Sequence, residues 1–241
     1  MDLGLSGRRA AVAAASAGLG FASAQALAAE GAQVVICGRD RARIDDAAAR
    51  IGNGCIAVVQ DVADAAGGAA FVAAAAEALG GLDIVVANAG GPPGGTFEST
   101  PIDLYEPALD LSLMSVVGMA KTAIPAMREQ RWGRFVAITS VSVRQPIPTL
   151  ILSNTARAGV TGFLKTVARE VAADGVTVNS VQPGLHATDR VTQLYGDASN
   201  LGPIGDPADF GSIVTFLCGD QARFVTGLQL HVDGGSYAGL Q

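Results

Sequence analysis

The alternation of short apolar runs with longer helical segments is the feature that most constrains the fold of this chain. Strands are expected over residues 9–15, 33–37, 55–59, 82–87, 134–139, 176–181 and 228–232. Helices are expected over residues 19–30, 41–51, 65–79, 105–130, 153–173 and 207–218. Strands that are apolar throughout indicate a sheet covered on both faces, and strand–helix alternation indicates right-handed parallel crossovers. The sequence therefore predicts a Rossmann-type α/β fold, a doubly wound parallel sheet of about seven strands, in a single domain over residues 1–241.

Composition argues against several classes of function. The 241 residues carry 16 Lys and Arg against 22 Asp and Glu, a net charge of −6, so a basic nucleic-acid-binding surface is not expected. With two His and three scattered Cys (Cys37, Cys55 and Cys218), a Cys/His metal cluster is not expected either. The most membrane-like segment, residues 65–79, falls short of the roughly 20 apolar residues that span a bilayer. We therefore expect a cytoplasmic protein without a metal, nucleic-acid or membrane partner.

The loop after the first strand is a candidate phosphate-binding segment, since parallel sheets bind ligands beyond the carboxyl ends of their strands. It reads Ala13-Ala14-Ala15-Ser16-Ala17-Gly18-Leu19-Gly20. Gly18 and Gly20 would open the first helix, where small residues let the backbone approach a pyrophosphate whose charge the helix N-terminus favours. Two Gly at a helix start also occur in plain turns, so this loop alone leaves both interpretations open.

Further short motifs follow the later strands in a defined order. They are Asp61-Val62, Asn88-Ala89-Gly90, Asn179, Pro183-Gly184 with Thr188, and Val232-Asp233-Gly234-Gly235. With Gly18 and Gly20, these motifs give the chain a resemblance to the short-chain dehydrogenase/reductase family, which includes 3-oxoacyl-carrier-protein reductases. The resemblance covers essentially the whole chain. The first loop of that family reads Thr-Gly-x-x-x-Gly-x-Gly, so Ala13 and Ala14 depart from its pattern.

The resemblance implies a nicotinamide dinucleotide cofactor. The implied binding residues are Ser16, Gly18, Leu19, Gly20, Arg39, Asp61, Val62, Asn88, Ala89, Gly90, Arg157, Pro183, Gly184 and Thr188. Gly38 stands where NAD-type relatives carry Asp, and Arg39 follows it. An Arg at this place accommodates the 2′-phosphate, so NADP(H) is favoured over NAD(H). Ala17 weakens the preference for NADP(H), because NADP-type relatives often carry a second basic residue at that position.

The catalytic residues that the resemblance implies are altered. In the family a Ser after the fifth strand polarises the substrate carbonyl, and a Tyr thirteen residues later donates the proton. A Lys four residues further binds the nicotinamide ribose, and a helix Asn completes a water relay. Alignment on Arg157-Ala158-Gly159-Val160 retains the Ser as Ser140 and places Ser153 and Arg157 at the Tyr and Lys positions. Counting back thirteen residues from Pro125 places Ser112 at the Asn position. None of the three Tyr residues is followed by Lys four positions later, so no other register restores the pair.

Three interpretations of this altered site remain open. In the first, hydride transfer continues with Ser140 and Ser153 bonded to the substrate oxygen, and the proton comes from water or from Tyr195 or His186 near a substrate lid over residues 188–207. In the second, the protein binds a dinucleotide without turnover, as a sensor or partner subunit. The third is non-redox chemistry such as dehydration. We favour the first, because the replacements at 153 and 157 are polar and hydrogen-bonding.

The resemblance also implies a small-molecule carbonyl or alcohol substrate, whose identity the sequence does not give. Family members are commonly dimers or tetramers. The helices expected over residues 105–130 and 153–173 look like those that pair in such assemblies. A homodimer or homotetramer is therefore expected.

Overall fold

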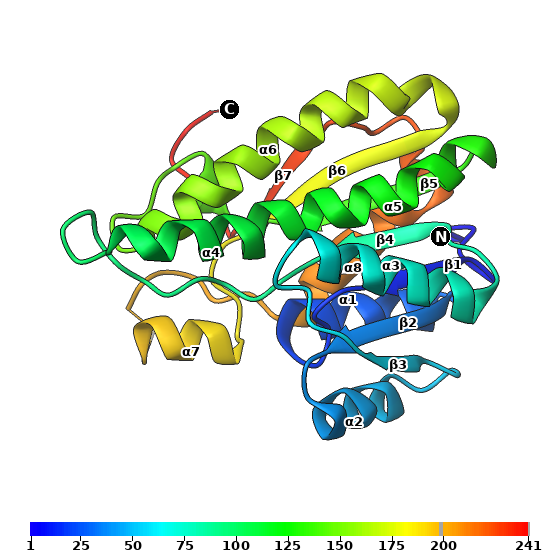
Figure 1. Ribbon diagram of the computed structural model, residues 1–241, viewed down its shortest axis with the longest axis horizontal. Coiled ribbons are helices and arrows are strands. Elements are labelled where there is room, and N and C mark those ends of the chain that lie inside the picture. The colour runs from blue at the N-terminus through cyan, green and yellow to red at the C-terminus, as the bar shows by residue number, and fades with distance from the viewer. Residues whose placement is uncertain (198–199, 241) are drawn as a thin grey trace.

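A seven-stranded sheet forms the centre of the molecule (Figure 1). The computed structural model describes residues 1–197 and 200–240. The strands are β1 (Arg9–Val12), β2 (Gln33–Gly38), β3 (Ile56–Val59), β4 (Ile84–Ala87), β5 (Gly133–Ile138), β6 (Val176–Pro183) and β7 (Gln229–Val232). They lie in the order β3-β2-β1-β4-β5-β6-β7, and each neighbouring pair is parallel. The predicted Rossmann-type fold class is confirmed.

Helices cover both faces of this sheet. They are α1 (Gly18–Ala29), α2 (Arg41–Ile51), α3 (Ala65–Leu79), α4 (Tyr105–Leu109), α5 (Ser115–Glu129), α6 (Ile151–Val171), α7 (Asp189–Tyr195) and α8 (Pro207–Cys218). One hydrophobic core lies between the sheet and α3, α5 and α6, and a second lies between the sheet and α1, α2 and α8. Figure 1 shows α7 below α4, away from these two layers.

The apolar strand runs supply both cores at once, because successive side chains of a strand point to opposite faces. Val85 of β4 and Phe135 of β5 lie in the core under α3, α5 and α6. Their neighbours Ile84 and Val136 lie in the core under α1, α2 and α8. Strands buried on both faces are therefore mostly apolar, as β4 is throughout, although β6 also buries the polar residues Thr177, Asn179, Ser180 and Gln182.

The sheet reverses its direction of growth between β1 and β4. From β1 the chain builds outward through β2 and β3, then returns to place β4 on the other side of β1. The loops that leave the carboxyl ends of β1 and β4 therefore diverge to opposite faces. Such a switch point opens a crevice in which doubly wound sheets bind their ligands.

The helix expected over residues 105–130 is interrupted. A 3-10 turn (Ile102–Leu104) precedes α4, and a π-helical turn (Asp110–Met114) separates α4 from α5. Within this region the Ser115 hydroxyl donates to the carbonyl of Leu111 at 2.6 Å, a type of bond that bends helices. Single π turns occur frequently at functional sites.

The strand β3 departs from the expectation that every strand is covered on both faces. It forms one edge of the sheet, and its side chains are only partly buried, with Ile56 and Val59 exposed. An edge strand has one neighbour instead of two, so fewer helices can lie over it. The neighbouring strand β2, inside the sheet, is buried along almost its whole length.

The helical run Ile102–Glu129 is long and apolar enough to span a membrane. The segment expected to be the most membrane-like, residues 65–79, forms a shorter apolar helix. Half of the most apolar window of Ile102–Glu129 is buried inside the protein. Met119 and Met127 from this run lie in the core beneath α5. Packing against the sheet therefore accounts for the buried half of this apolar window.

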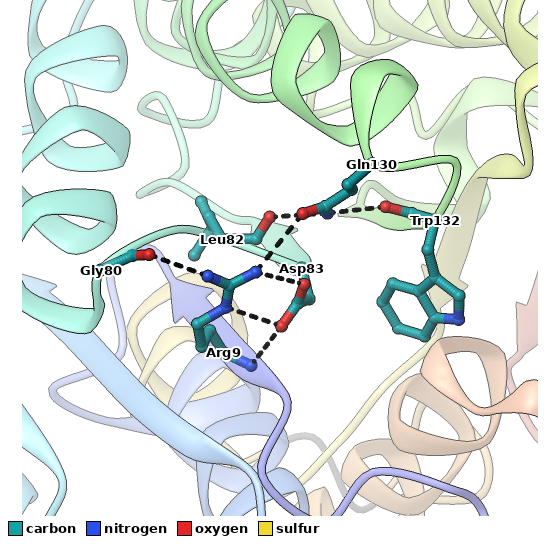
Figure 2. A network of polar contacts seen from close by, with 6 residues as sticks. All are labelled: Arg9, Gly80, Leu82, Asp83, Gln130 and Trp132. Carbon is teal, nitrogen blue, oxygen red and sulfur yellow. Dashed lines mark hydrogen bonds and ion pairs between the residues drawn. The ribbon is translucent and has the colours of Figure 1, made fainter.

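A network of polar side chains joins the amino ends of β1 and β4 (Figure 2). The Asp83 carboxylate accepts from the backbone N–H of Arg9 at 2.9 Å, from its Nε at 2.9 Å and from its Nη2 at 2.8 Å. Arg9 also donates to the carbonyl of Gly80 and to the side-chain oxygen of Gln130. Burial alone would raise the pKa of Asp83, but the hydrogen bonds and charge of Arg9 outweigh it and hold that pKa below its usual value.

The same end of the sheet holds a second arginine cluster around Trp132. The guanidinium carbons of Arg8 and Arg134 lie 3.8 and 4.2 Å from the centre of the Trp132 ring, a distance at which a cation is attracted to the ring face. The indole N–H donates to Asp220, whose carboxylate also pairs with Arg134. The Trp132 ring therefore contacts two cations.

Candidate active site

A cavity of about 1160 Å³ lies at the carboxyl ends of the central strands. Most residues that the sequence singles out line it: Ser16, Gly18, Leu19, Arg39, Asp61, Val62, Asn88, Ala89, Gly90, Ser140, Ser153, Arg157, Pro183, Gly184 and Thr188. Two candidates, Gly20 and Ser112, are buried beside the cavity without lining it. The fold therefore gathers segments from across the chain into one concave site, as ligand pockets of this fold class require.

The start of α1 presents its backbone to this cavity. The cap residue Ala17 makes no side-chain hydrogen bond, whereas α2, α3 and α8 are capped by Asp40, Asp64 and Asp206. The first N–H groups of α1 are therefore left for another acceptor, and a phosphate is well suited because the helix dipole also favours negative charge. A Cβ on Gly20 would lie 2.7 Å from the carbonyl oxygen of Ala14, so only glycine permits this close turn.

Ala14 holds a backbone conformation that normally needs glycine. Its φ is +48°, although it carries a Cβ. The chain leaves β1 at this point, and so the strand ends at Val12 instead of continuing to residue 15 as expected. Asn88 donates to the carbonyl of Ala14 at 3.2 Å and joins this turn to the loop after β4.

Basic side chains lie at the end of the cavity next to β2. Arg39 and Arg43 both line it, as does Gly38, which has no side chain to fill the space. The sequence did not predict a role for Arg43. Its position is that of an ordinary residue in the first turn of α2, where its backbone N–H donates to the capping side chain of Asp40. The two guanidiniums could pair with a phosphate there, although Asp61 and Asp64, which follow the neighbouring strand β3, also line the cavity.

The opposite end of the cavity is built by β5 and α6. Ser153 and Arg157 lie one helical turn apart on α6, and both line the cavity. Ser140 follows β5, and its Oγ accepts from the backbone N–H of Ser142 at 3.1 Å, which leaves its own O–H available to donate. Arg157 donates to the carbonyl of Ile138 at 3.0 Å, so the end of β5 fixes its guanidinium beside Ser140.

The charge of Arg157 is not balanced by a carboxylate. It forms no ion pair within residues 1–197 and 200–240. Burial, and then the nearby charge of Arg190, lower the pKa of Arg157 to about 10. The group therefore stays protonated at neutral pH and carries an uncompensated positive charge beside the cavity.

The sequence matches a family model described as enoyl-(acyl carrier protein) reductase over residues 13–237. The chain belongs to the short-chain dehydrogenase/reductase family. It is 34% identical to L-rhamnose 1-dehydrogenase (NAD(P)(+)) of Azotobacter vinelandii, covering 94% of this chain and 95% of that protein. It is 31% identical to the 3-oxoacyl-[acyl-carrier-protein] reductase FabG of Vibrio cholerae, covering 98% and 99% of the two chains.

Solved structures of the family agree with this assignment. The crystal structure of L-sorbose reductase from Gluconobacter frateurii, complexed with NADPH and L-sorbose, superposes with a TM-score of 0.91 at 30% identity, and all of both chains is covered. A short chain dehydrogenase/reductase family protein superposes with a TM-score of 0.90 at 34% identity, covering 99% of this chain and all of the other. The chain is thus a member of an oxidoreductase family whose fold it reproduces from end to end.

Ser112, aligned with the helix Asn of the family, lies in the π-helical turn between α4 and α5. It is almost fully buried, and its hydroxyl has no hydrogen-bond partner within the described residues. An unpaired buried hydroxyl costs stability unless a water or ligand satisfies it. The structure therefore places Ser112 behind the cavity wall and not in direct contact with the cavity.

The segment over residues 188–207, expected to form a lid, contains α7; residues 198 and 199 lie outside the described part of the chain. Tyr195 from α7 lines the cavity, as does Tyr237 from the C-terminal segment, which the sequence reasoning passed over. His186 also lines it but is nearly buried, with its ring edge-on to Phe210 and its Nδ1 3.3 Å from the carbonyl of Gly184.

Proposed function

We propose that this protein is an NADP(H)-dependent oxidoreductase that transfers a hydride between the nicotinamide and a carbonyl or alcohol substrate. The strongest support is the composition of one cavity. One end has the glycine turn at the start of α1, which no side chain caps. The other end has the hydroxyls of Ser140 and Ser153 beside Arg157, which forms no ion pair within the described residues. The first is suited to a dinucleotide phosphate and the second to a polarised oxygen.

The residues present fit a dinucleotide. The first N–H groups of α1 would hold the pyrophosphate, and the open space at Gly90, where an added Cβ would meet nothing within 4 Å, would admit the ribose. Arg39 and Arg43 would pair with the 2′-phosphate, which is why we prefer NADP(H). When bound, the cofactor supplies the hydride. L-sorbose reductase, similar in fold, was solved with NADPH.

Ser140 and Ser153 would hold the substrate oxygen. Both hydroxyls can donate to a carbonyl oxygen, and donors aimed at a developing negative charge lower the barrier to hydride addition. Arg157 would hydrogen-bond the ribose of the cofactor and place positive charge near the same oxygen. Ser153 is too short, and its hydroxyl too weak an acid, to replace the phenol of the family Tyr.

The proton would come from a group other than Ser153. Two phenols line the cavity, Tyr195 and Tyr237, and we assign the role to Tyr195 because it lies on the lid helix α7. In the variant Tyr195→Phe, kcat should fall by about 10²–10⁴-fold, as expected for loss of a general acid. Tyr237→Phe is the matched control and should leave kcat near the wild-type value. If neither variant changes kcat, water is the donor and the assignment to Tyr195 is wrong.

The oxidoreductase activity is tested by following nicotinamide absorbance with purified protein, NADPH and a broad panel of ketones and aldehydes, and the reverse reaction with NADP+ and alcohols. We expect NADPH consumption with at least one class of carbonyl. Tight binding of NADPH without turnover of any member would contradict the proposal and favour a dinucleotide-binding sensor or partner subunit.

The cofactor preference is tested separately by calorimetric titration. Arg39→Ala should weaken NADPH binding by about 10- to 100-fold, the value of a lost charge-assisted pair, and leave NADH binding nearly unchanged. NADH that binds the wild-type protein as tightly as NADPH would reject the preference. We further propose a homodimer or homotetramer, as is common in the family, and light scattering on the purified protein would measure it.

A further inference from the structure

A second arginine, Arg190, reaches the same end of the cavity as Arg157. It is the second residue of α7, and its Nη2 donates to the carbonyl of Pro92 at 2.6 Å. It lies close enough to Arg157 for the two positive charges to repel each other. The short helix α7 is thus fastened to the loop after β4 by the guanidinium itself.

Gly91 makes room for this guanidinium. A Cβ on Gly91 would lie 2.7 Å from Nη2 of Arg190 and 3.0 Å from its Cζ and its Nε. The planar group therefore lies directly against the backbone of residue 91, and any larger residue there would displace it. Its position is fixed from two sides, by contact with Gly91 and by the bond to Pro92.

Neither arginine is neutralised by the protein. An arginine has five N–H donors, and within residues 1–197 and 200–240 each of these two uses one of them, on a backbone carbonyl. Four carboxylates line the cavity, Asp61, Asp64, Asp110 and Asp189, and none of them forms an ion pair with either arginine. Two partly buried like charges held together are costly unless an anion binds them.

Building on the proposed hydride transfer, we infer that the substrate is an oxo acid, a carbonyl compound with a carboxylate next to the reacting carbon. Arg190 would bind the carboxylate through two parallel N–H···O bonds, for which guanidinium geometry is suited, while Ser140 and Ser153 hold the ketone oxygen. Leu150, Ile147 and Leu194 line the cavity and suit an apolar remainder of the molecule.

The overall reaction balances without a further reagent. The hydride adds to the carbonyl carbon, one proton adds to its oxygen, and the carboxylate is unchanged, so an oxo acid, NADPH and a proton give a hydroxy acid and NADP+. Arg190 is in this account a substrate-binding and specificity-determining residue. Arg157 serves the cofactor ribose and adds to the positive potential that attracts the anion.

The test compares 2-oxo acids of four to eight carbons with their methyl esters, which keep the ketone and remove the charge. Binding is measured by calorimetry on protein saturated with NADP+, so that no turnover is needed, and kcat/KM is measured with NADPH. We expect the acids to bind more tightly than their esters. Arg190→Gln should weaken the binding of the acids by about 10- to 100-fold and weaken that of the esters much less, and Arg190→Lys should restore part of the loss for the acids.

Arg169→Gln is the matched control, because it removes an exposed arginine from α6 outside the cavity, and it should change no constant. Equal loss for acids and esters in Arg190→Gln would overturn the inference, since it would indicate a structural role. Loss of NADP+ affinity without substrate would also overturn it, since Arg190 would then serve the cofactor. If the acids bind in a way that depends on Arg190 but are not reduced, the inferred carboxylate site is correct and the proposed hydride transfer is wrong.

Discussion

Arg9 at one end of the sheet and Arg157 and Arg190 at the other differ in whether a carboxylate pairs with them. At the amino ends of β1 and β4, Arg9 is matched by the carboxylate of Asp83 and by two further oxygens, from Gly80 and Gln130 (Figure 2). At the carboxyl ends, Arg157 and Arg190 line a cavity, and among the described residues each donates to one backbone carbonyl. Arg9 is thus paired by the protein itself, whereas Arg157 and Arg190 have donors that no described residue accepts.

This difference separates residues that stabilise the fold from residues that serve function. Removal of one partner from a buried ion pair leaves an uncompensated charge and is strongly destabilising. Removal of a charge that has no partner costs little stability, because no interaction with an opposite charge is lost. Substitutions at the amino end should therefore change the free energy of unfolding, and substitutions at the carboxyl end should change binding and turnover.

The largest effect is expected from restoring the family pair in the double variant Ser153→Tyr with Arg157→Lys. In a protein that also carries Tyr195→Phe, and so lacks the proton donor proposed above, kcat should rise by about 10²–10⁴-fold, the usual contribution of a general acid. The matched control, Ser153→Phe with Arg157→Lys, has the same ring without the phenol and should show no gain. Equal rates in the two variants would mean that proton donation is not limiting.

At the amino end, Asp83→Asn should lower the free energy of unfolding by about 2–3 kcal/mol, less than for a fully enclosed pair because the Arg9 side chain is 27% exposed. Urea denaturation measures this. Asp45→Asn is the control, since its pair with Arg41 is exposed and should contribute no more than about 1 kcal/mol. Similar losses in the two variants would remove the distinction between the buried network and the surface.

The pKa of Asp83 adds a pH dependence with a defined sign. Because Arg9 holds that pKa below its unfolded value of about 3.9, the stabilisation is fully present above that pH and is lost as the pH falls through the folded value. The difference in unfolding free energy between wild type and Asp83→Asn should therefore shrink below about pH 4. A difference that stays constant down to pH 2.5 would exclude the charge of Asp83 as its source.

At the carboxyl end, Arg157→Gln should weaken NADPH binding by about 10- to 100-fold, as expected for a lost charge-assisted hydrogen bond. Arg157→Lys should retain most of the affinity, because it keeps the charge on the same face of α6. Calorimetric titration of the two variants provides the comparison. Unchanged affinity in Arg157→Gln would refute the role of this side chain in holding the ribose.

The smallest effect is expected at Ala14, where the left-handed backbone is strained by a side chain. Ala14→Gly removes that strain, which costs about 1–2 kcal/mol, but it also gives the unfolded chain more freedom, so a net gain of up to about 1 kcal/mol is expected. Thermal unfolding would record it. A lower melting temperature would show that the rest of the loop already accommodates the alanine.

The sequence was sufficient for the sheet, because most positions of the buried parallel strands are apolar. It was also sufficient for most of the cavity lining, because the loops after those strands carry the motifs of the family. It did not predict the π turn at Ser112, because the apolar pattern continues through this turn without a break. It also missed Arg190, since a single arginine in a polar loop has no periodic signal. The role of that residue became visible only through its contacts with Gly91 and Pro92.

The most direct test of the contrast between the two ends is the shift in melting temperature that saturating NADPH produces in wild type, Asp83→Asn and Arg157→Gln. Asp83→Asn should melt lower than wild type without ligand and show the full NADPH shift. Arg157→Gln should melt close to wild type without ligand. Its NADPH shift should be smaller, because saturating ligand stabilises the folded state by about 1.4 kcal/mol less for each tenfold loss of affinity. The account is contradicted if Arg157→Gln is destabilised as much as Asp83→Asn, or if its NADPH shift equals that of wild type.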